Sequence, residues 1–481
     1  MLSIIFKYIE FCPFIIMMLS ISFGIFFIIC KRNSLIMFLN TFFGILLTSY
    51  YILFFRVKLV SVTNFFYHFD KFSIFFSLLI LFVGLITSIF AYFYLNKNKP
   101  YVEEYYILLL LLVLGSVSLN FAKHMLIFFV SMEMITLSTV GLIYFFKDCK
   151  KSIEASLKYM IFSNFSSIFI LFGFGIIYFF NGSVEYSNLF LLLGKYNIYE
   201  QAVVFVGILM VLFGIFFKMS LFPFHFIFPD IYQVSNPLVL ISFSTINKLS
   251  FFSFLLYFIS TTMILKFSFF YNLIQIFAFL SIFFGNFLAI FQKDIKRLLG
   301  YASISQVGYL MIVLLNINYF PFSSENMVLY FLNYVLCNVC IFGSMTIINK
   351  NYSGNNTNNV FYNIFYKHSL LFKSLYLSFL SLSGIPLTIG FLNKLYMFSS
   401  AIYSKLWYLL AVTTFSSILG MYVYFKILMS LYNYKKHESD IDVENFSYTQ
   451  KILEVIIFTI SITLVLFNFF PCNVFILKNF F

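Results

Sequence analysis

Apolar residues fill the chain in long runs that alternate with short polar connections. Each run has about 20 residues, the length that an α-helix needs to cross the roughly 30 Å hydrocarbon core of a bilayer. The pattern therefore predicts an all-α polytopic membrane protein with about fourteen transmembrane helices. The predicted spans are 11–30, 34–55, 72–96, 104–120, 122–146, 155–180, 201–223, 237–264, 267–291, 298–317, 325–348, 370–400, 405–432 and 452–470.

Two of these spans contain a proline that interrupts the helical pattern. Proline lacks a backbone N–H and disfavours helix at the residue before it, so Pro223 predicts a break in the seventh span. Pro386, which follows Gly384, predicts a second break in the twelfth span. A lysine accompanies each break, with Lys218 before Pro223 and Lys394 after Pro386. Broken transmembrane helices often mark the ion or substrate site of a transporter.

The matching positions of the two breaks predict an internal repeat. Spans four to eight and nine to thirteen form two units of five helices, and an odd number of spans inverts the second unit relative to the first. We expect a single membrane domain over 1–481. Its predicted parts are three N-terminal helices in 1–103, a first five-helix repeat in 104–264, a second in 265–432, and a polar loop with the last helix in 433–481.

The composition supports this class and excludes others. The 481 residues are 62% hydrophobic and 10% charged, whereas average soluble proteins are roughly a quarter charged. The net charge of +13 does not indicate nucleic-acid binding, because Lys and Arg occur in short groups between apolar runs and not along one face. Most of these groups lie in the odd-numbered connections, which the positive-inside rule places in the cytoplasm or the organelle matrix. The implied partner is the lipid bilayer.

Ionisable side chains inside the spans are the candidate functional residues. A charge near the middle of a bilayer costs about 2.5–3.5 kcal/mol, so such residues are rare and usually functional. The candidates are Glu133, Lys158, Lys218, Lys248 and Lys394, together with His225 just after the first break.

Glu133 lies deep in the fifth span, where its carboxyl group cannot easily reach an interface. One interpretation is a static structural ion pair. The other is that Glu133 controls the protonation of a lysine, because desolvation lowers the pKa of a buried lysine and a nearby carboxylate raises it again. Such an amine could bind and release a proton near neutral pH. Lys158 lies about one turn inside its span, where extension of its side chain to the interface is an alternative.

Motifs for nucleotide or redox-centre binding are absent from the sequence. It contains no P-loop, no Rossmann fingerprint, no His pair with haem-like spacing and no Cys cluster. Cys337 and Cys340 form a C-x-x-C inside a span, for which a buried apolar role is the favoured interpretation. We expect neither a cofactor nor a metal in this chain, so an ion gradient or partner subunits must drive any ion movement.

The same segments resemble a known family. The stretch around the first break reads FFKMSLFPFHFIFPDIYQVSNPL. It is similar to the signature F-K-x-S-x-x-P-F-H-x-W-x-P-D-V-Y-x-G-A-P of proton-translocating NADH:quinone oxidoreductase, or respiratory complex I. Further similar blocks are EASLKYMIFSNFSSIFILFGFGIIYFFNGS, KRLLGYASISQVGYLM and SGIPLTIGFLNKLYMF. Together they cover most of residues 120–400 and are specific for the antiporter-like membrane subunits of that enzyme.

Among the three such subunits, L, M and N, the sequence resembles subunit N most. Lys394 in the second broken helix matches N, whereas M carries a glutamate there, and the resemblance assigns this lysine to the second half-channel. The sequence departs from the family at Leu387, where a second proline is usual, and at Phe228, where threonine is usual. Val234, Ser235 and Asn236 stand where the family usually has Gly-Ala-Pro.

The resemblance implies roles for the other candidates. Glu133 and Lys218 would form an ion pair that modulates a proton-loading lysine, and Lys158 would belong to the same buried hydrophilic axis. Lys248 would bridge two half-channels, with His225 nearby. The chain would couple electron transfer from NADH to quinone, carried out by partner subunits, to proton movement.

The resemblance also implies partners and a location. The neighbouring membrane subunits would be M and K, and FMN, iron–sulfur clusters and quinone would be bound by partner subunits. The length and the fourteen spans favour a bacterial inner membrane, with the mitochondrial inner membrane as the alternative. Two other functions stay open: a subunit of an Mrp-type cation/proton antiporter, and a purely structural membrane scaffold.

Overall fold

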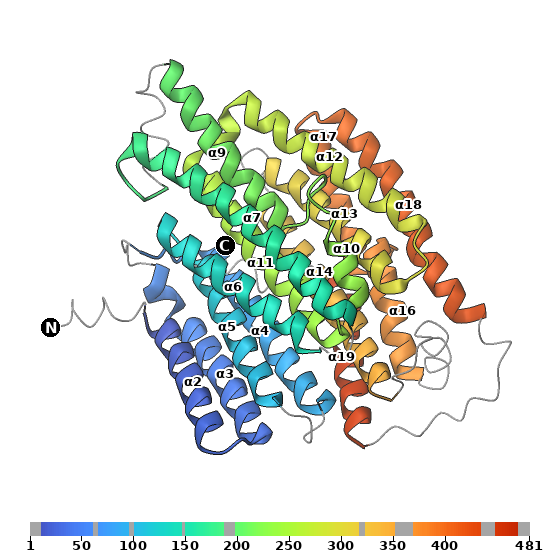
Figure 1. The fold of residues 1–481 in the computed structure, drawn as a ribbon. Coiled ribbons are helices and arrows are strands. Elements are labelled where there is room, and N and C mark those ends of the chain that lie inside the picture. The colour runs from blue at the N-terminus through green and yellow to red at the C-terminus, as the bar shows by residue number, and fades with distance from the viewer. Residues whose placement is uncertain are drawn as a thin grey trace. The chain divides into compact units, whose positions relative to one another are not determined.

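The computed structural model describes residues 11–60, 66–95, 101–146, 150–186, 198–316, 323–351, 369–433 and 448–469 (Figure 1). Within these ranges the regular elements are helices, accompanied by two isolated β-bridges, Tyr67–Ala122 and His124–Glu185. The helices are α2 (Cys12–Cys30), α3 (Ser34–Val60), α4 (Lys71–Tyr94), α5 (Val102–Asn120), α6 (Met125–Phe145), α7 (Lys150–Asn181), α9 (Ile198–Lys218), α10 (Phe228–Val234), α11 (Pro237–Thr262), η1 (Ile264–Lys266), α12 (Ser268–Ile290), α13 (Ile295–Leu315), α14 (Ser323–Asn351), α16 (Ser369–Ser383), α17 (Ile389–Tyr403), α18 (Trp407–Asn433) and α19 (Tyr448–Phe469).

The helices confirm the predicted all-α membrane fold. Within the part of the chain that the structure describes, 13 helices are long and apolar enough to cross a membrane. The remaining predicted span, 370–400, is present as the shorter helices α16 and α17, which are separated by the predicted break. The seventh span is also broken, although α9 ends at Lys218 and not at the predicted 223. The predicted polar connections 349–367 and 433–451 lie almost entirely outside the described residues.

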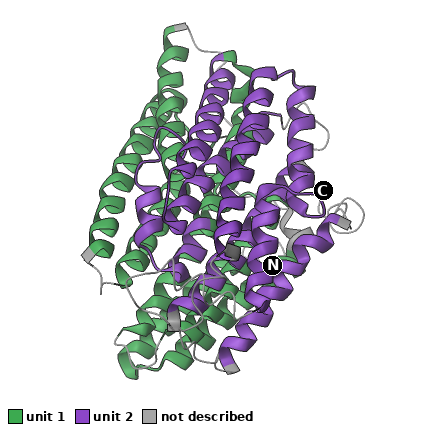
Figure 2. Cartoon of the chain, turned by 90° about the vertical axis from the view of Figure 1, so that its right-hand side faces the viewer, with its two compact units in different colours: residues 1–219, 245–268 green, residues 220–244, 269–481 purple. Residues whose placement is uncertain are grey.

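The chain divides into two compact units, shown in different colours in Figure 2. Unit 1 contains residues 1–219 and 245–268, and unit 2 contains residues 220–244 and 269–481. The division falls at the first helix break and again inside α11. The arrangement of the chain as two inverted five-helix repeats stays a prediction.

Aromatic side chains fill much of the interior of unit 1. Phe128 of α6 packs on Phe254 of α11, with ring centroids 3.9 Å apart. Tyr186, which follows α7, is fully buried and packs edge-on against Phe254 and Phe258. These contacts place the C-terminal part of α11 against α6 and the end of α7.

Small residues allow close helix packing in unit 2. A Cβ atom added at Gly285 of α12 would lie 2.7 Å from the backbone nitrogen of Ser305 in α13. Gly300 of α13 lies close to α10, where an added Cβ would be 3.1 Å from Pro229 Cα. Arg297 also pairs with Asp230 across this contact at 3.2 Å. The short helix after the first break is thereby fixed to α13.

Candidate functional site

The first helix break begins directly after Lys218. That lysine is the last residue of α9, and Ser220 then takes a positive φ of 65°, which ends the helix. The Phe222–Pro223 peptide bond is cis, and the chain turns until α10 starts at Phe228. The break therefore starts earlier than the proline rule placed it, since the helix ends where φ changes sign and not at the residue before Pro223.

Glycines bring α7 and α9 into backbone contact beneath this break. A Cβ atom added at Gly173 would lie 2.5 Å from the carbonyl oxygen of Gly207, and one added at Gly214 would lie 2.8 Å from that of Ser166. The two pairs are seven residues apart on each helix, so they occupy one face of each helix. Small residues at such spacing let helix backbones approach closely in membranes. The next turn along this face carries Lys218 on α9 and Ser163 on α7.

Lys218 is buried and bonded to the backbone of α7. Its Nζ donates a hydrogen bond to the carbonyl oxygen of Ser163 at 3.1 Å, and the side chain is 3% exposed. The same carbonyl accepts a second bond from Ser166 Oγ at 2.6 Å. An ammonium group has three donors, so one backbone carbonyl does not satisfy the charged form completely. The site therefore needs water or a carboxylate to complete the partners of a protonated Lys218.

The carboxylate near Lys218 is that of Glu133 in α6. Its Oε2 accepts a hydrogen bond from Thr136 Oγ1 at 3.1 Å, while its Oε1 is buried without a hydrogen-bond partner in the described structure. The carboxylate interacts electrostatically with the Lys218 amine and with Tyr159 of α7. The structure thus brings Glu133 and Lys218 within electrostatic reach, with Lys218 bonded to Ser163 in the described residues and not to the carboxylate.

Lys248 occupies the middle of α11. Its side chain is 3% exposed, and the polar residues around it on the helix, Thr245, Asn247 and Ser250, are buried as well. The Asn247 carbonyl accepts a hydrogen bond from Ser250 Oγ at 2.9 Å. A buried amine on a helix with this polar content is a site that can accept or release a proton.

Lys158 lies in a different environment from the other lysines. Its side chain is 50% exposed, and its amine lies 2.5 Å from Glu154, one turn earlier on α7. Exposed pairs of this kind contribute little to stability, because water and salt screen the two charges. The structure places Lys158 on the surface of α7, and its place in a buried axis stays a prediction.

The second helix break surrounds Pro386. Helix α16 ends at Ser383, Gly384 takes a φ of 77°, and the Gly384 backbone nitrogen donates to the Leu380 carbonyl oxygen at 3.1 Å. A left-handed glycine directly after a helix is a common way to satisfy its last carbonyls. Helix α17 then starts at Ile389. The break predicted in the twelfth span is confirmed.

Lys394 reaches back from α17 into this break. Its Nζ donates to the carbonyl oxygen of Ser383, the last residue of α16, at 2.5 Å. A Cβ atom added at Gly384 would lie 2.6 Å from Lys394 Cδ, so glycine is needed to admit the lysine side chain. Lys218 and Lys394 therefore share one feature: each amine donates to a backbone carbonyl, that of Ser163 within α7 for Lys218 and that of Ser383 at the end of α16 for Lys394.

His225 is buried inside the first break. Its Nδ1 lies 3.2 Å from the Pro223 carbonyl oxygen, and its ring stacks on Phe222 with centroids 4.7 Å apart. His225 and Lys394 belong to unit 2, whereas Glu133, Lys218 and Lys248 belong to unit 1. Within unit 1 the structure brings Glu133 near Lys218, and a continuous path through Lys248, His225 and Lys394 stays a prediction.

Several residues of the site were missed by the sequence analysis. Ser163, Thr136 and Tyr159 contact or surround the two charged groups of unit 1. A detectable signal was the seven-residue spacing of Ser166 and Gly173, which marks the face of α7 that meets α9. No comparable signal distinguishes Thr136 from the other hydroxyl residues of its helix.

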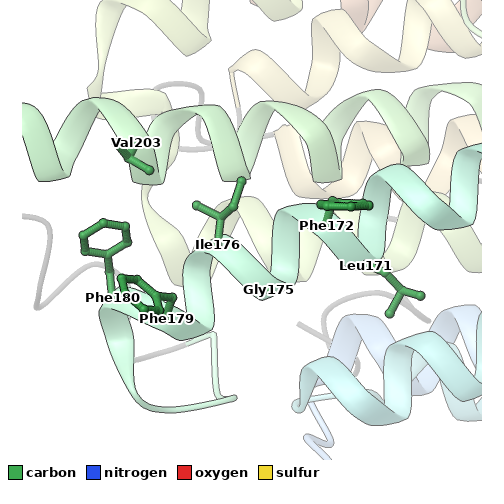
Figure 3. A pocket seen from close by; sticks show the side chains of 7 residues that line it. All are labelled: Leu171, Phe172, Gly175, Ile176, Phe179, Phe180 and Val203. Atoms are coloured by element: carbon green, nitrogen blue, oxygen red, sulfur yellow. The ribbon is translucent and has the colours of Figure 1, made fainter.

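The outer side of the α7–α9 pair carries an open groove of about 650 Å³. Figure 3 shows its lining: Leu171, Phe172, Gly175, Ile176, Phe179 and Phe180 of α7, and Val203 of α9. These side chains are apolar, so the groove belongs to the lipid-facing surface and supplies no group for proton transfer. Among the described residues no group of three or more His, Cys, Asp or Glu could hold a metal ion.

The two cysteines of the C-x-x-C are free and buried within α14. Cys337 Sγ donates to Asn333 Oδ1 at 3.3 Å, and Cys340 Sγ donates to the Ile457 carbonyl oxygen at 3.7 Å. They are packed as small side chains with weak hydrogen bonds, as in many protein interiors.

Solved structures share this fold. A chain of respiratory complex I from Thermus thermophilus with bound aureothin superposes with a TM-score of 0.78 at 23% identity, covering 96% of this chain and 98% of that one. A chain of the Mrp complex from Dietzia sp. DQ12-45-1b superposes with a TM-score of 0.80 at 16% identity, covering 96% and 95%. At these identities the likeness establishes the fold.

Sequence relatives are more specific. The family model described as "NADH:quinone oxidoreductase/Mrp antiporter, TM" matches residues 122–420. NADH-quinone oxidoreductase subunit N of Buchnera aphidicola subsp. Acyrthosiphon pisum is 36% identical over 445 residues, which is 91% of each chain. The matched range contains both helix breaks and the candidate residues Glu133, Lys218, Lys248 and Lys394. The chain therefore belongs to the NADH-quinone oxidoreductase subunit N family of antiporter-like membrane proteins.

Proposed function

We propose that this chain conducts protons across a bacterial inner membrane as subunit N of an NADH:quinone oxidoreductase. The observation that carries the proposal is Lys218, a buried amine on a backbone carbonyl, within electrostatic reach of the Glu133 carboxylate. A lysine is a compact and readily titrated proton carrier when it is buried. Glu133 would set how tightly Lys218 retains its proton.

The proton path would continue through the other buried amines. Lys218 would load a proton when Glu133 is close and charged, and would release it when that electrostatic attraction is weakened. Lys248, with His225, would pass the proton between two half-channels, and Lys394 would hold it beside the second helix break. Lys158 would join this axis only if its exposed pair with Glu154 is covered in the assembled complex.

Partner subunits would supply the energy. Electron transfer from NADH to quinone would use FMN and iron–sulfur clusters in those subunits, and the resulting charge changes would reach this chain electrostatically. The neighbouring membrane subunits M and K would contact it in the bilayer. No redox step is assigned to this chain, because its candidate groups are amines, a carboxylate and an imidazole.

Replacement of Lys218 with alanine tests the proposal. The variant removes the buried amine, so we expect NADH-driven proton pumping to fall about a hundredfold or more, the lower range of the loss of a positioned proton-transfer group. The measurement is proton uptake by inside-out membrane vesicles that contain the whole complex. Normal pumping by a normally assembled Lys218→Ala complex would refute the role.

A matched control is Lys373→Ala. Lys373 is an exposed lysine of α16, so its removal changes the same net charge without touching the buried site. We expect its pumping rate and its assembly on a native gel to equal those of the unmodified complex.

An Mrp-type cation/proton antiporter is the second candidate. It is favoured by the TM-score of 0.80 with the Mrp complex and by the shared family description. The 36% identity with a subunit N over 91% of the chain favours the oxidoreductase.

A further inference from the structure

The second helix break leaves two short helices whose positions must be fixed by their surroundings. Helices α16 and α17 have 15 residues each, fewer than the roughly 20 that cross the hydrocarbon core. Lys394 belongs to α17, and the carbonyl oxygen that accepts its hydrogen bond belongs to Ser383 of α16. That bond forms only while both helices keep their positions, and a third helix of unit 2, α14, contacts both.

An asparagine of α14 holds the end of α16. Asn333 is buried, and its Oδ1 accepts a hydrogen bond from the hydroxyl of Ser381. Ser381 lies in the last turn of α16, two residues before Ser383, and is 1% exposed. The same amide oxygen accepts a weak bond from Cys337 Sγ, one turn further along α14, at 3.3 Å. Asn333 therefore ties the end of α16 that carries the Ser383 carbonyl to α14.

An asparagine of α17 makes the second bond to α14. Asn393, directly before Lys394, is 1% exposed, and its Nδ2 donates to the Leu329 carbonyl oxygen of α14 at 3.3 Å. Leu329 lies four residues before Asn333, so in an α-helix the same carbonyl accepts the Asn333 backbone N–H. The two asparagine bonds thus hold α16 and α17 to one turn of α14.

A glycine lets the two short helices meet at this turn. A Cβ atom added at Gly390, in the first turn of α17, would overlap the Ser381 carbonyl oxygen. The same atom would lie 3.3 Å from Asn333 Nδ2. The end of α16 and the start of α17 therefore lie against each other beside Asn333.

Packing alone does not favour an amide at position 393. Asn393 Oδ1 is buried without a hydrogen-bond partner among the described residues. An unpartnered buried acceptor is costly, and leucine, which has a similar shape, would avoid that cost. What the amide offers and leucine does not is the bond from Asn393 Nδ2 to α14.

We propose that Asn333 and Asn393 are positioning residues for Lys394. By fixing α16 and α17 to α14, they keep the lysine amine on the Ser383 carbonyl oxygen. The inference rests on the proposed function, because that function gives Lys394 a proton to hold. Neither asparagine takes part in proton transfer, and each acts through the position of a helix.

Asn393→Leu in the whole complex tests this role, because it removes the bond to α14 and keeps a side chain of similar shape. We expect proton pumping by membrane vesicles to fall about two- to tenfold at unchanged assembly, the effect of one neutral hydrogen bond. In a structure of the purified variant complex, the Lys394 amine should have left the Ser383 carbonyl oxygen. An amine that stays on that carbonyl, or normal pumping, would overturn the inference.

Ser381→Ala tests the other bond, and it serves also where Asn393→Leu does not assemble. It removes the donor to Asn333, so we expect a similar fall in pumping and the same displacement of the Lys394 amine. Ser381→Cys keeps a weak S–H donor and should recover part of the pumping. Equal losses in Ser381→Ala and Ser381→Cys would show that the bond to Asn333 is not the cause.

Asn338→Leu and Ser378→Ala are the matched controls. Both residues are buried, and each donates to a carbonyl oxygen of its own helix. Asn338 Nδ2 bonds to Tyr334 in α14 at 2.9 Å, and Ser378 Oγ bonds to Leu375 in α16 at 2.8 Å. Neither bond joins two helices, so we expect normal pumping and an undisplaced lysine. Losses equal to those of the test variants would contradict the positioning role.

The same measurements separate this inference from the proposed function. If Asn393→Leu and Ser381→Ala pump normally while Lys218→Ala does not, the positioning role is wrong and the proposed function stands. If Lys218→Ala also pumps normally, the proposed function fails first.

Discussion

Leu387 shows how one residue can explain a departure from a family pattern. It stands where the family usually has a second proline, and its φ in the second break is 78°. A proline ring fixes φ near −65°, so proline does not fit this backbone conformation. Leucine at positive φ is itself uncommon. The left-handed φ at Leu387 therefore excludes proline from this position in the structure.

His68 lies outside the membrane spans, and its burial leads us to predict that the stability of the protein depends on pH. It precedes α4, its ring stacks on Tyr257 with centroids 3.4 Å apart, and its Nδ1 is buried without a hydrogen-bond partner among the described residues. The pKa of His68 is lowered from 6.5 to about 3, chiefly by burial, with nearby Lys123 adding to the lowering and backbone hydrogen bonds at Phe121 and Ala122 opposing it.

The direction of the pH effect on stability follows from the difference between the pKa of His68 in the folded and unfolded states. A folded-state pKa below the unfolded value favours the neutral ring, so its stabilisation is complete above pH 6.5 and is lost as the pH falls toward about 3. We expect the unfolding temperature of the purified complex to decrease over this window, and to decrease less in His68→Gln. Equal slopes for the two proteins would contradict the prediction.

The residue-level site could be predicted only in part from the sequence. Charges inside apolar runs stand out, so Glu133, Lys218, Lys248 and Lys394 were all found. Their partners could not be found, because Lys218 bonds to the backbone of Ser163, and any residue type has that carbonyl. The exposure of Lys158 also depends on which face of α7 turns outward, and the apolar residues around that helix do not distinguish its faces.

At the scale of elements, the contact of α7 with α9 sets the position of Lys218 (Figure 1). Gly173, Gly207 and Gly214 let the two backbones meet, and this meeting brings Lys218 to Ser163. The presence of the helices was predictable, because an apolar run long enough to cross a membrane has few alternatives to a transmembrane helix. The end of α9 was not, since the positive φ at Ser220 follows from tertiary packing around the break and not from a glycine or a proline.

Gly214→Val tests this contact without changing any titratable group. An added Cβ would lie 2.8 Å from the Ser166 carbonyl oxygen and also against Ile170, so the helices must separate. Overpacking of this kind costs about 1–3 kcal/mol. We expect lower thermal stability and lower pumping, because separation of the helices breaks the bond between Lys218 and Ser163.

Gly175→Ala is the control for this variant. Gly175 lies on the same helix α7, lines the open groove in Figure 3, and has no atom within 4 Å of an added Cβ. Alanine is also a better helix former than glycine by roughly 1 kcal/mol. Unchanged or slightly higher stability is expected, together with normal pumping. A loss of pumping in Gly175→Ala equal to that in Gly214→Val would show that helix contact is not the cause.

At the scale of the whole molecule, the candidate groups are amines, a carboxylate and an imidazole, which are types of group that bind and release protons. Each unit has a lysine beside a helix break, Lys218 in unit 1 and Lys394 in unit 2. The sequence predicted both breaks from proline. The division into units inside α11 could not be predicted, because that helix is a continuous apolar run through the boundary.

Purification of the tagged chain from its native membrane distinguishes two sources of energy for proton movement, partner subunits and an ion gradient. We expect the chain to co-purify with a flavin- and iron–sulfur-containing assembly that oxidises NADH and reduces quinone, because a relative that is 36% identical to it is an NADH-quinone oxidoreductase subunit N. In that assembly, Lys218→Ala should lower pumping while the flavin and iron–sulfur content stays constant. Purification with an Na⁺-dependent proton exchange activity and no NADH oxidation would identify an Mrp-type antiporter instead, because the same fold would then be driven by the cation gradient.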